Sequence, residues 1–176
     1  MNTGQTILTI GAIIFLGLNV LSTNKTSLQH GVILQQTEIG LFAASLASSL
    51  LEEAQGKAFD KNSIEGFLTS PTQCTSVDSL GPEPGEKRED YNDFDDFNWM
   101  KGGAKGDNVV VRCDTIKIRD IDTFLRWSKV CYVDTSSPDV YKNTMTFSKK
   151  LTVYVWGMSS QDTVQMSYLF SYWSFR

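Results

Sequence analysis

The strongest constraint in this sequence is its beginning, which contains no charged side chain before Lys25. The most apolar part is ILTIGAIIFLGLNVL, residues 7–21. As a helix this run spans only about 22 Å, whereas the whole uncharged stretch spans about 36 Å and matches a ~30 Å bilayer core. We therefore expect the segment to be covered by lipid or by other protein chains, because so much apolar surface is unfavourable in water.

Three interpretations of the uncharged segment are open. A cleaved secretory signal needs a basic region before the apolar run and a small-x-small cleavage site after it, and the sequence shows neither clearly. A permanent membrane anchor is weakened by Gly11, Gly17 and Asn19. The third interpretation, which the following residues favour, is a helix that occupies a membrane only temporarily and is later buried among copies of itself.

Helical periodicity resumes after the polar sequence STNKTS, residues 22–27. Large apolar residues form one stripe at helical spacing, and mostly small residues, which allow close helix packing, form a second. The first stripe is Leu28, Val32, Ile39, Phe42, Leu46 and Leu50, and the second is Gly40, Ala44, Ala47 and Leu51. The pattern ends at 56–59, before a turn signal at 60–62. A continuous helix over 5–58 would be about 80 Å long. The alternative is a hairpin of two helices broken near residues 22–26.

The C-terminal part of the chain is rich in β-branched and aromatic residues and predicts an antiparallel sheet. Four strands are expected, at residues 109–118, 124–133, 145–156 and 164–175. In the third, Leu151, Val153 and Val155 share one face, which would pack on the second half of the helix. The predicted fold class is α+β, with a helical region over 1–59, a loop-rich acidic region over 60–108 and a sheet head over 109–176.

Charge is distributed unevenly along the chain. The net charge is −1 over residues 1–59, −7 over 60–98 and +4 over 99–176, which gives −4 overall and a pI of about 5.0. This balance argues against nucleic acid as the main partner. His30 is the single histidine, which argues against catalytic triads and histidine metal sites, and we expect it on the helix surface. The sequence shows no phosphate loop and no nucleophile with a base, so we predict neither an enzyme nor a cofactor.

The acidic run over residues 89–96 is a candidate calcium site, because Ca²⁺ prefers carboxylate ligands. The candidate ligands are Asp90, Asp93, Asp95 and Asp96. The run lacks the glycine and glutamate positions of an EF-hand, so a solvated turn or a patch facing basic residues of a neighbouring copy is the favoured alternative. Those basic residues would be Arg126, Lys129, Lys149 and Lys150.

Cysteines and large aromatic residues complete the set of candidates. Cys74, Cys113 and Cys131 allow at most one internal disulfide. A bond between Cys113 and Cys131 is expected if their strands pair, and the alternative is three buried thiols.

A match to a glycosylation sequon begins at Asn24. Five aromatic residues are expected in the core rather than in an exposed adhesive patch: Trp127, Tyr154, Trp156, Tyr172 and Trp173.

A long amphipathic N-terminal helix, an uncharged front half and a small antiparallel head together resemble the type IV pilin and pseudopilin superfamily. The start Met-Asn-Thr-Gly4 is similar to a short class III leader ending in glycine. In that family a prepilin peptidase cuts after the glycine, which here would leave Gln5 first. The family usually has a basic leader, Phe or Met as the first mature residue and glutamate at the fifth, where this chain has Thr9. The run YNDFDDFNW, residues 91–99, also resembles an acidic-aromatic element of some pilin-like proteins.

This resemblance implies a structural protein rather than an enzyme. The expected function is the subunit of an extracellular type IV pilus-like filament, inserted in the inner membrane before assembly and polymerising with identical copies through its apolar helix. The expected filament-core residues are Ile7, Leu8, Ile10, Ile13, Ile14, Phe15, Leu16, Leu18, Val20, Leu21 and Leu28. The alternatives are a pseudopilin or minor subunit of a secretion system and a membrane-anchored protein whose head binds a surface ligand.

Overall fold

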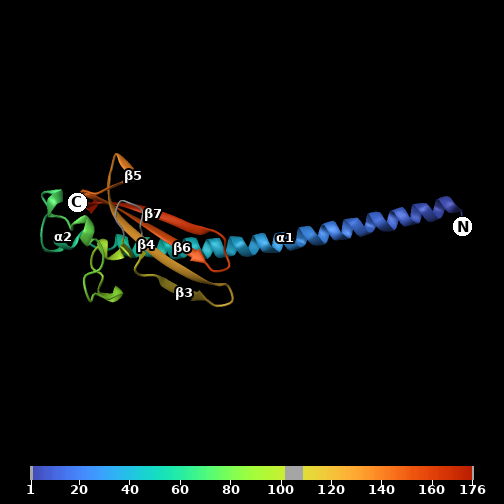
Figure 1. Cartoon of the computed structure of the whole chain (residues 1–176), viewed down its shortest axis with the longest axis horizontal. Coiled ribbons are helices and arrows are strands. Elements are labelled where there is room, and N and C mark those ends of the chain that lie inside the picture. The colour runs from blue at the N-terminus through green and yellow to red at the C-terminus, as the bar shows by residue number, and fades with distance from the viewer. Residues whose placement is uncertain (1, 102–108, 176) are drawn as a thin grey trace. The chain divides into compact units, whose positions relative to one another are not determined.

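The computed structural model describes residues 2–101 and 109–175 of the chain (Figure 1). It contains two compact units, residues 1–38 and residues 39–176. One helix, α1, runs from Thr3 to Gln55 and contributes to both units. The fold is α+β, because the second unit places the end of this helix against a small antiparallel sheet.

Helix α1 continues through the polar sequence at residues 22–27, so the predicted alternative of a helical hairpin is wrong. The polar side chains in this region bond to carbonyl groups of the preceding turn instead of competing with the helix. Thr23 Oγ1 donates to Asn19 O at 2.9 Å, and Thr26 Oγ1 donates to Ser22 O at 3.0 Å. The first proline of the sequence is Pro71, so nothing in the helix removes a backbone donor.

The main sheet has five antiparallel strands. They are β3 (Asp114–Ile118), β4 (Asp122–Asp134), β5 (Ser137–Lys142), β6 (Ser148–Gly157) and β7 (Thr163–Ser171). The strand order is β3-β4-β6-β7, and β5 pairs with β4 beside this path. The short strands β1 (Met100–Lys101) and β2 (Val109–Val110) form a separate pair.

The core lies between one face of this sheet and the last turns of α1. The predicted inward residues Leu151, Val153 and Val155 of β6 are buried, as the alternation of the sequence indicates. From the helix, Ala43, Ala47 and Ala54 share the core with larger apolar residues, and Leu50 is fully buried among them. Small helix residues let the backbone come close to the sheet, because they leave little side chain between the two.

The region between α1 and the sheet has little regular structure but contributes strongly to the core. It contains the short helix α2 (Lys61–Glu65) and four 3₁₀ turns, η1 (Pro71–Gln73), η2 (Val77–Ser79), η3 (Arg88–Asp90) and η4 (Asp95–Phe97). Its buried aromatic residues are Phe59, Tyr91, Phe94, Phe97 and Trp99. The described residues of this segment are therefore packed rather than merely solvated.

Three details of the predicted strands are wrong. The expected strand at 109–118 is interrupted, because Val111 N and Arg112 N donate to Trp99 O and leave the ladder before β3 begins. Strand β5, with the sequence SPDVYK, is not among the four predicted strands. Residues 172–175 form the 3₁₀ turn η5 (Tyr172–Phe175) instead of continuing β7.

Candidate assembly surface and the buried ion network

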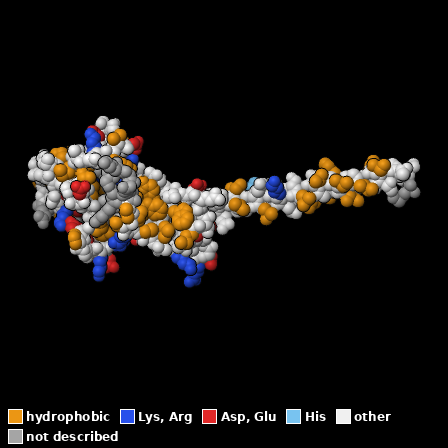
Figure 2. All heavy atoms as spheres, viewed as in Figure 1, with side chains coloured by type: hydrophobic (Ala, Val, Ile, Leu, Met, Phe, Trp, Pro, Cys, Tyr) orange, Lys and Arg blue, Asp and Glu red, His pale blue; other side chains and the backbone are white. Residues whose placement is uncertain are grey.

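The apolar side chains predicted for a filament core are all exposed on the first part of α1. Their exposed fractions lie between 51% and 74%, from Val20 to Leu8 and Leu28. The same helix is long and apolar enough to cross a membrane, by length and composition only. Apolar side chains along this helix are orange in Figure 2. Eleven exposed large apolar residues on one helix form a candidate assembly surface. We define this surface as the eleven predicted filament-core residues between Ile7 and Leu28.

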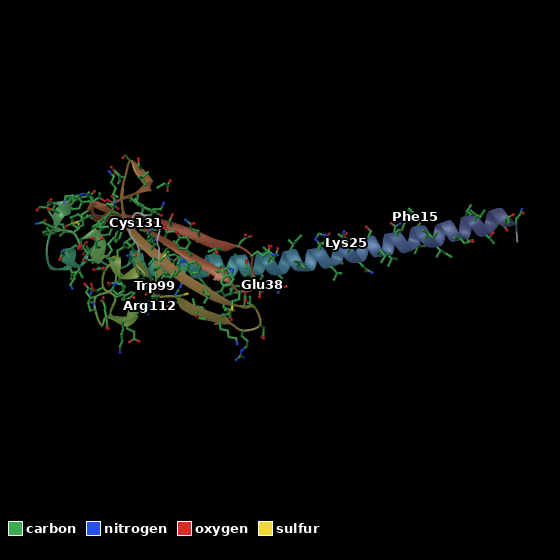
Figure 3. All side chains as sticks on the ribbon, in the orientation of Figure 1. Phe15, Lys25, Glu38, Trp99, Arg112 and Cys131 are labelled. Atoms are coloured by element: carbon green, nitrogen blue, oxygen red, sulfur yellow. The ribbon has the colours of Figure 1, made fainter. Side chains whose placement is uncertain are left out.

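Neighbouring residues keep this surface uncharged until Lys25, and Glu38 is the first acidic residue (Figure 3). Gly4 and Gln5, the predicted processing position, lie in the first turn of α1, where Gln5 N donates to Asn2 O at 2.9 Å. Thr9 donates its hydroxyl to Thr6 O at 2.9 Å. His30 is exposed on the helix, as predicted.

The head contains a fully buried lysine, which corrects the prediction that Lys149 faces acidic groups of a neighbouring copy. Lys149 Nζ donates to Asp60 Oδ2 at 2.7 Å, to Phe59 O at 2.9 Å and to Asp95 Oδ1. Both Lys149 and Asp60 have fully buried side chains, and that of Asp95 is 3% exposed. A lysine is buried this deeply only when partners satisfy its three donors, and here each donor has one.

The two carboxyl groups around Lys149 have different environments. Asp60 caps α2 and accepts bonds from Asn62 N at 3.1 Å and Thr75 N at 2.9 Å. Burial alone would raise the pKa of Asp60, but the charge of Lys149 and these hydrogen bonds lower it below 3.8 overall. Burial raises the pKa of Asp95, and the nearby Asp60 charge adds to this rise, while Lys149 opposes it. Asp60 is therefore the better anion of the two.

Arg126 is also buried, so the prediction that it faces a neighbouring copy is wrong as well. Its Nη2 lies 3.1 Å from Asp114 Oδ2, and its Nη1 donates to Leu46 O of helix α1 at 3.0 Å. Lys150 pairs with Asp139 at 2.7 Å on the same chain, and Lys129 Nζ lies 4.9 Å from the ring centroid of Tyr141. All four basic residues thus have contacts within the chain.

The acidic run is buried from Asp93 to Asp96, where it forms a packed rather than a solvated turn, whereas Glu89 and Asp90 are exposed. Asp93 Oδ1 accepts from Asp95 N at 2.8 Å, and Asp96 Oδ2 accepts from Asn92 N at 2.9 Å and Asp93 N at 3.1 Å. Burial, together with the charges of Asp95 and Asp96, raises the pKa of Asp93 to about 8. Asp93 thus holds the backbone at the start of η4, and Asp96 holds the backbone just before it, an arrangement that the sequence pattern alone did not reveal.

A different acidic group could hold a metal ion. Carboxylate oxygens of Glu83, Glu86 and Asp96 lie within 4.8 Å of one another, so only Asp96 of the predicted calcium ligands belongs to the group. Asp96 Oδ1 is buried and has no hydrogen-bond partner among the described residues. Lys61 pairs with Glu83 at 2.7 Å, and burial raises the pKa of Glu86 to about 7. Oxygen ligands of this kind suit a hard divalent cation.

The predicted disulfide does not form, and Cys74, Cys113 and Cys131 are free thiols. Strand β3 begins with Asp114, which is paired with Arg126 of the antiparallel strand β4. Cys113, one residue earlier, therefore lies beside Trp127. Cys131 is four residues further along β4, about 13 Å away, whereas a disulfide needs Cα atoms about 4.4–6.8 Å apart. Burial raises the pKa of both Cys74 and Cys131 to about 11, which keeps these thiols protonated.

The large aromatic residues divide between the core and the outer face of the sheet. Tyr172 packs against the core, as predicted. Trp127 and Tyr154 are paired across β4 and β6 on the opposite face and stack with ring centroids 5.8 Å apart. Both of these are half-buried, as is Trp156, whereas Trp173 is exposed. The prediction that all five lie in the core is therefore wrong.

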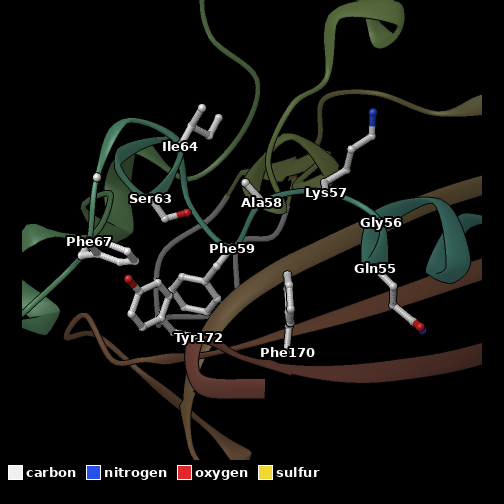
Figure 4. A pocket seen from close by; sticks show the side chains of 11 residues that line it. Gln55, Gly56, Lys57, Ala58, Phe59, Ser63, Ile64, Phe67, Phe170 and Tyr172 are labelled. Atoms are coloured by element: carbon white, nitrogen blue, oxygen red, sulfur yellow. The ribbon is translucent and has the colours of Figure 1, made fainter. Parts of the chain in front are cut away.

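A cavity of about 610 Å³ follows the end of α1. Its apolar lining includes Phe59, Ile64, Phe67, Phe170 and Tyr172 (Figure 4). Gln55, Lys57 and Ser63 are also among the residues that line it. No local pattern indicates this cavity, because its walls come from segments more than 100 residues apart in the chain.

No protein-family model matches the chain, and no curated protein or solved structure matches it either.

Proposed function

We propose that this protein is the structural subunit of an extracellular type IV pilus-like filament and that it polymerises through the candidate assembly surface of α1. The observation that carries the proposal is the exposure of eleven large apolar side chains between Ile7 and Leu28. Burying one such side chain contributes about 1.5–3 kcal/mol, so their combined burial exceeds the ordering cost of association. Identical subunits that associate head to tail without closing a ring form an open helical filament.

The lack of charge over residues 2–24 supports the same proposal. An unpaired charge would oppose the packing of many helices together, and this stretch has none. Because Thr9 occupies the position of the family's glutamate, assembly would depend on apolar packing rather than on a buried ion pair at that position. Before assembly, the same apolar surface would hold the subunit in the inner membrane.

One observation favours a second candidate, a membrane-anchored protein whose head binds a surface ligand. The stacked pair of Trp127 and Tyr154 lies on the sheet face opposite the core, where it is only half-buried. Half-buried aromatic residues are common in binding surfaces. Such a protein would be anchored through the same helix but would form no filament.

The test uses the full-length chain, purified in detergent and imaged by negative-stain microscopy after detergent removal. We expect long, uniform fibres from the unmodified protein. Leu16→Lys places a charge within the assembly surface and should abolish the fibres. Gln35→Lys adds the same charge at an exposed polar position of the same helix and should leave them intact. A detergent-free, monomeric full-length protein would contradict the proposal.

Processing of the leader is a separate question that intact mass answers. Cleavage after Gly4 would leave Gln5 as the first residue. Protein recovered from a host that expresses a prepilin peptidase should then lack residues 1–4. An intact Met1 in assembled fibres would show that assembly does not need cleavage.

A further inference from the structure

The Lys149 cluster, defined as Lys149, Asp60 and Asp95, places a primary amine against two carboxyl groups with no access to water. Its three side chains are at most 3% exposed, whereas every other ion pair among the described residues includes a more exposed partner. Aromatic rings enclose it, with Lys149 Nζ 4.6 Å from the ring centroid of Phe59 and 5.3 Å from that of Tyr132. An amine and a carboxylic acid that are held together can condense to an amide with release of one water molecule.

We propose that Lys149 and Asp95 condense into an intramolecular isopeptide bond between Lys149 Nζ and Asp95 Cγ, with Asp60 as the proton acceptor. This inference concerns the head alone and does not depend on filament assembly. Lys149 Nζ already contacts the carboxyl group of Asp95, so the reacting groups need no long-range movement. Two reactive groups held in contact can react as fast as they would at an effective concentration of about 10⁵ M or more.

Asp60 and Asp95 differ in a way that assigns their roles. Asp60 Oδ2 lies 2.7 Å from Lys149 Nζ, and its carboxylate is held by Asn62 N, Thr75 N and the Thr75 hydroxyl. It is therefore the fixed anion that can receive a proton from the ammonium group. Burial favours the neutral acid form of Asp95, which is the form whose carbon accepts a nucleophile.

The atoms of the reaction balance without any other reagent. The Lys149 ammonium transfers one proton to Asp60, and the resulting amine attacks Cγ of the neutral Asp95 carboxyl group. The C–N bond forms, a second nitrogen proton and the Asp95 hydroxyl group leave together as water, and Asp60 remains protonated. No oxidation or reduction occurs, and the amide keeps one N–H and one oxygen from Asp95.

The surroundings of the cluster favour the product but make the reaction slow. The two carboxyl groups raise the pKa of Lys149 although its burial acts in the opposite direction, so the neutral amine forms only transiently. Condensation replaces a buried ion pair with a neutral amide, which removes a desolvation penalty. Exclusion of water from the site also opposes hydrolysis of the bond. The bond would link β6 covalently to η4 and so tie the acidic segment to the sheet.

The decisive measurement is the intact mass of the folded full-length chain, after prolonged incubation in detergent below its unfolding temperature. We expect a mass lower than that of the sequence by one water molecule. Trypsin should release peptide 89–101 joined to peptide 143–150, with no cleavage after Lys149. This branched peptide distinguishes the isopeptide bond from loss of water elsewhere in the chain. A folded protein with the full mass of its sequence and an unmodified peptide 89–101 would overturn the proposal.

Each substitution is expected to change the intact mass of the protein in a different way. Asp95→Asn should still react but release ammonia in place of water, because its side-chain amide offers nitrogen as the leaving group. Lys149→Gln should keep the full mass of its sequence, whereas the control Lys150→Gln on the same strand should lose water as the unmodified protein does. Asp60→Asn should stop the reaction, and formation of the bond in this variant would overturn the role of Asp60. If Lys149→Gln does not fold, the mass of the unmodified protein still decides the result.

Discussion

Arg126 Nη1 lies 3.0 Å from the carbonyl oxygen of Leu46, so an arginine of the central strand β4 bonds to the backbone of helix α1. The same side chain reaches Asp114 on the neighbouring strand β3 at 3.1 Å. One buried guanidinium group therefore connects three elements of the head. Leaving such a buried charge unpaired is costly, because the interior offers no water to solvate it.

Replacing Arg126 with methionine should destabilise the head by about 1–3 kcal/mol, because it removes the bond to Leu46 O and one partner of Asp114, which keeps Arg88 at 3.0 Å. Urea unfolding followed by circular dichroism would measure the change. Arg119→Met removes an exposed arginine and should change the free energy of unfolding by less than about 0.5 kcal/mol. Equal effects of the two substitutions would show that the bonds of Arg126 to Leu46 and Asp114 contribute little.

Gly157 allows the end of β6 to approach helix α1 closely. A Cβ atom at this position would lie 2.9 Å from Ile39 Cγ2 and 2.8 Å from Asp122 Oδ2. Gly157→Ala should therefore destabilise the head by about 1–3 kcal/mol through overpacking. Gly66→Ala is the matched control, since no atom lies within 4 Å of its added Cβ. A lower midpoint temperature of thermal unfolding for Gly157→Ala, with an unchanged midpoint for Gly66→Ala, would confirm this prediction.

Ala47 is fully buried where α1 faces the sheet. Enlarging it to leucine should push the helix away from β4 and β6 and cost about 1–3 kcal/mol. Ser45→Leu makes a comparable change two residues earlier on the exposed side of α1 and should have a small effect. Chemical denaturation of both variants, measured in the same detergent, would test the prediction. A tolerated Ala47→Leu would mean that the helix is not packed tightly at this position.

The stability of the head should depend on Asp93 between about pH 4 and pH 8. Its pKa is raised to about 8 in the folded state, so the folded protein binds a proton that the unfolded chain has already lost over this range. Stability from this group is present at low pH and is lost as the pH rises, by about 1.4 kcal/mol per pH unit.

Asp93→Asn keeps an oxygen that can accept the bond from Asp95 N but cannot ionise. We expect this variant to lose most of the decline in stability between pH 5 and pH 8 that Asp93 causes. The measurement is a series of urea unfolding curves at different pH values. An identical slope in the two proteins would show that Asp93 does not titrate in this range.

Much of the fold could be predicted because it follows from local patterns. The long helix comes from apolar spacing without proline, and the buried face of β6 comes from alternation at Leu151, Val153 and Val155. Prediction failed where a local signal was ambiguous. Residues 109–118 have uniform strand propensity, but backbone bonds from Val111 and Arg112 to Trp99 interrupt the strand.

The candidate sites were harder to predict than the elements that carry them. Lys149 is preceded by a serine and followed by another lysine, so its local sequence suggests an exposed strand. Only the packing of Phe59, Asp60 and Asp95 around it makes burial possible. Likewise, the separation of Cys113 and Cys131 depends on the β3–β4 register, which no single strand specifies.

By itself, the sequence determined an uncharged apolar helix and an alternating sheet, because hydrophobic periodicity acts within each element and needs no distant partner. The tertiary structure alone decided which charges are buried and which carboxyl groups meet. Asp60, Asp95 and Lys149 are widely separated in sequence but in direct contact in the fold. Such contacts depend on loop paths and strand register, so a linear pattern of charges cannot specify them.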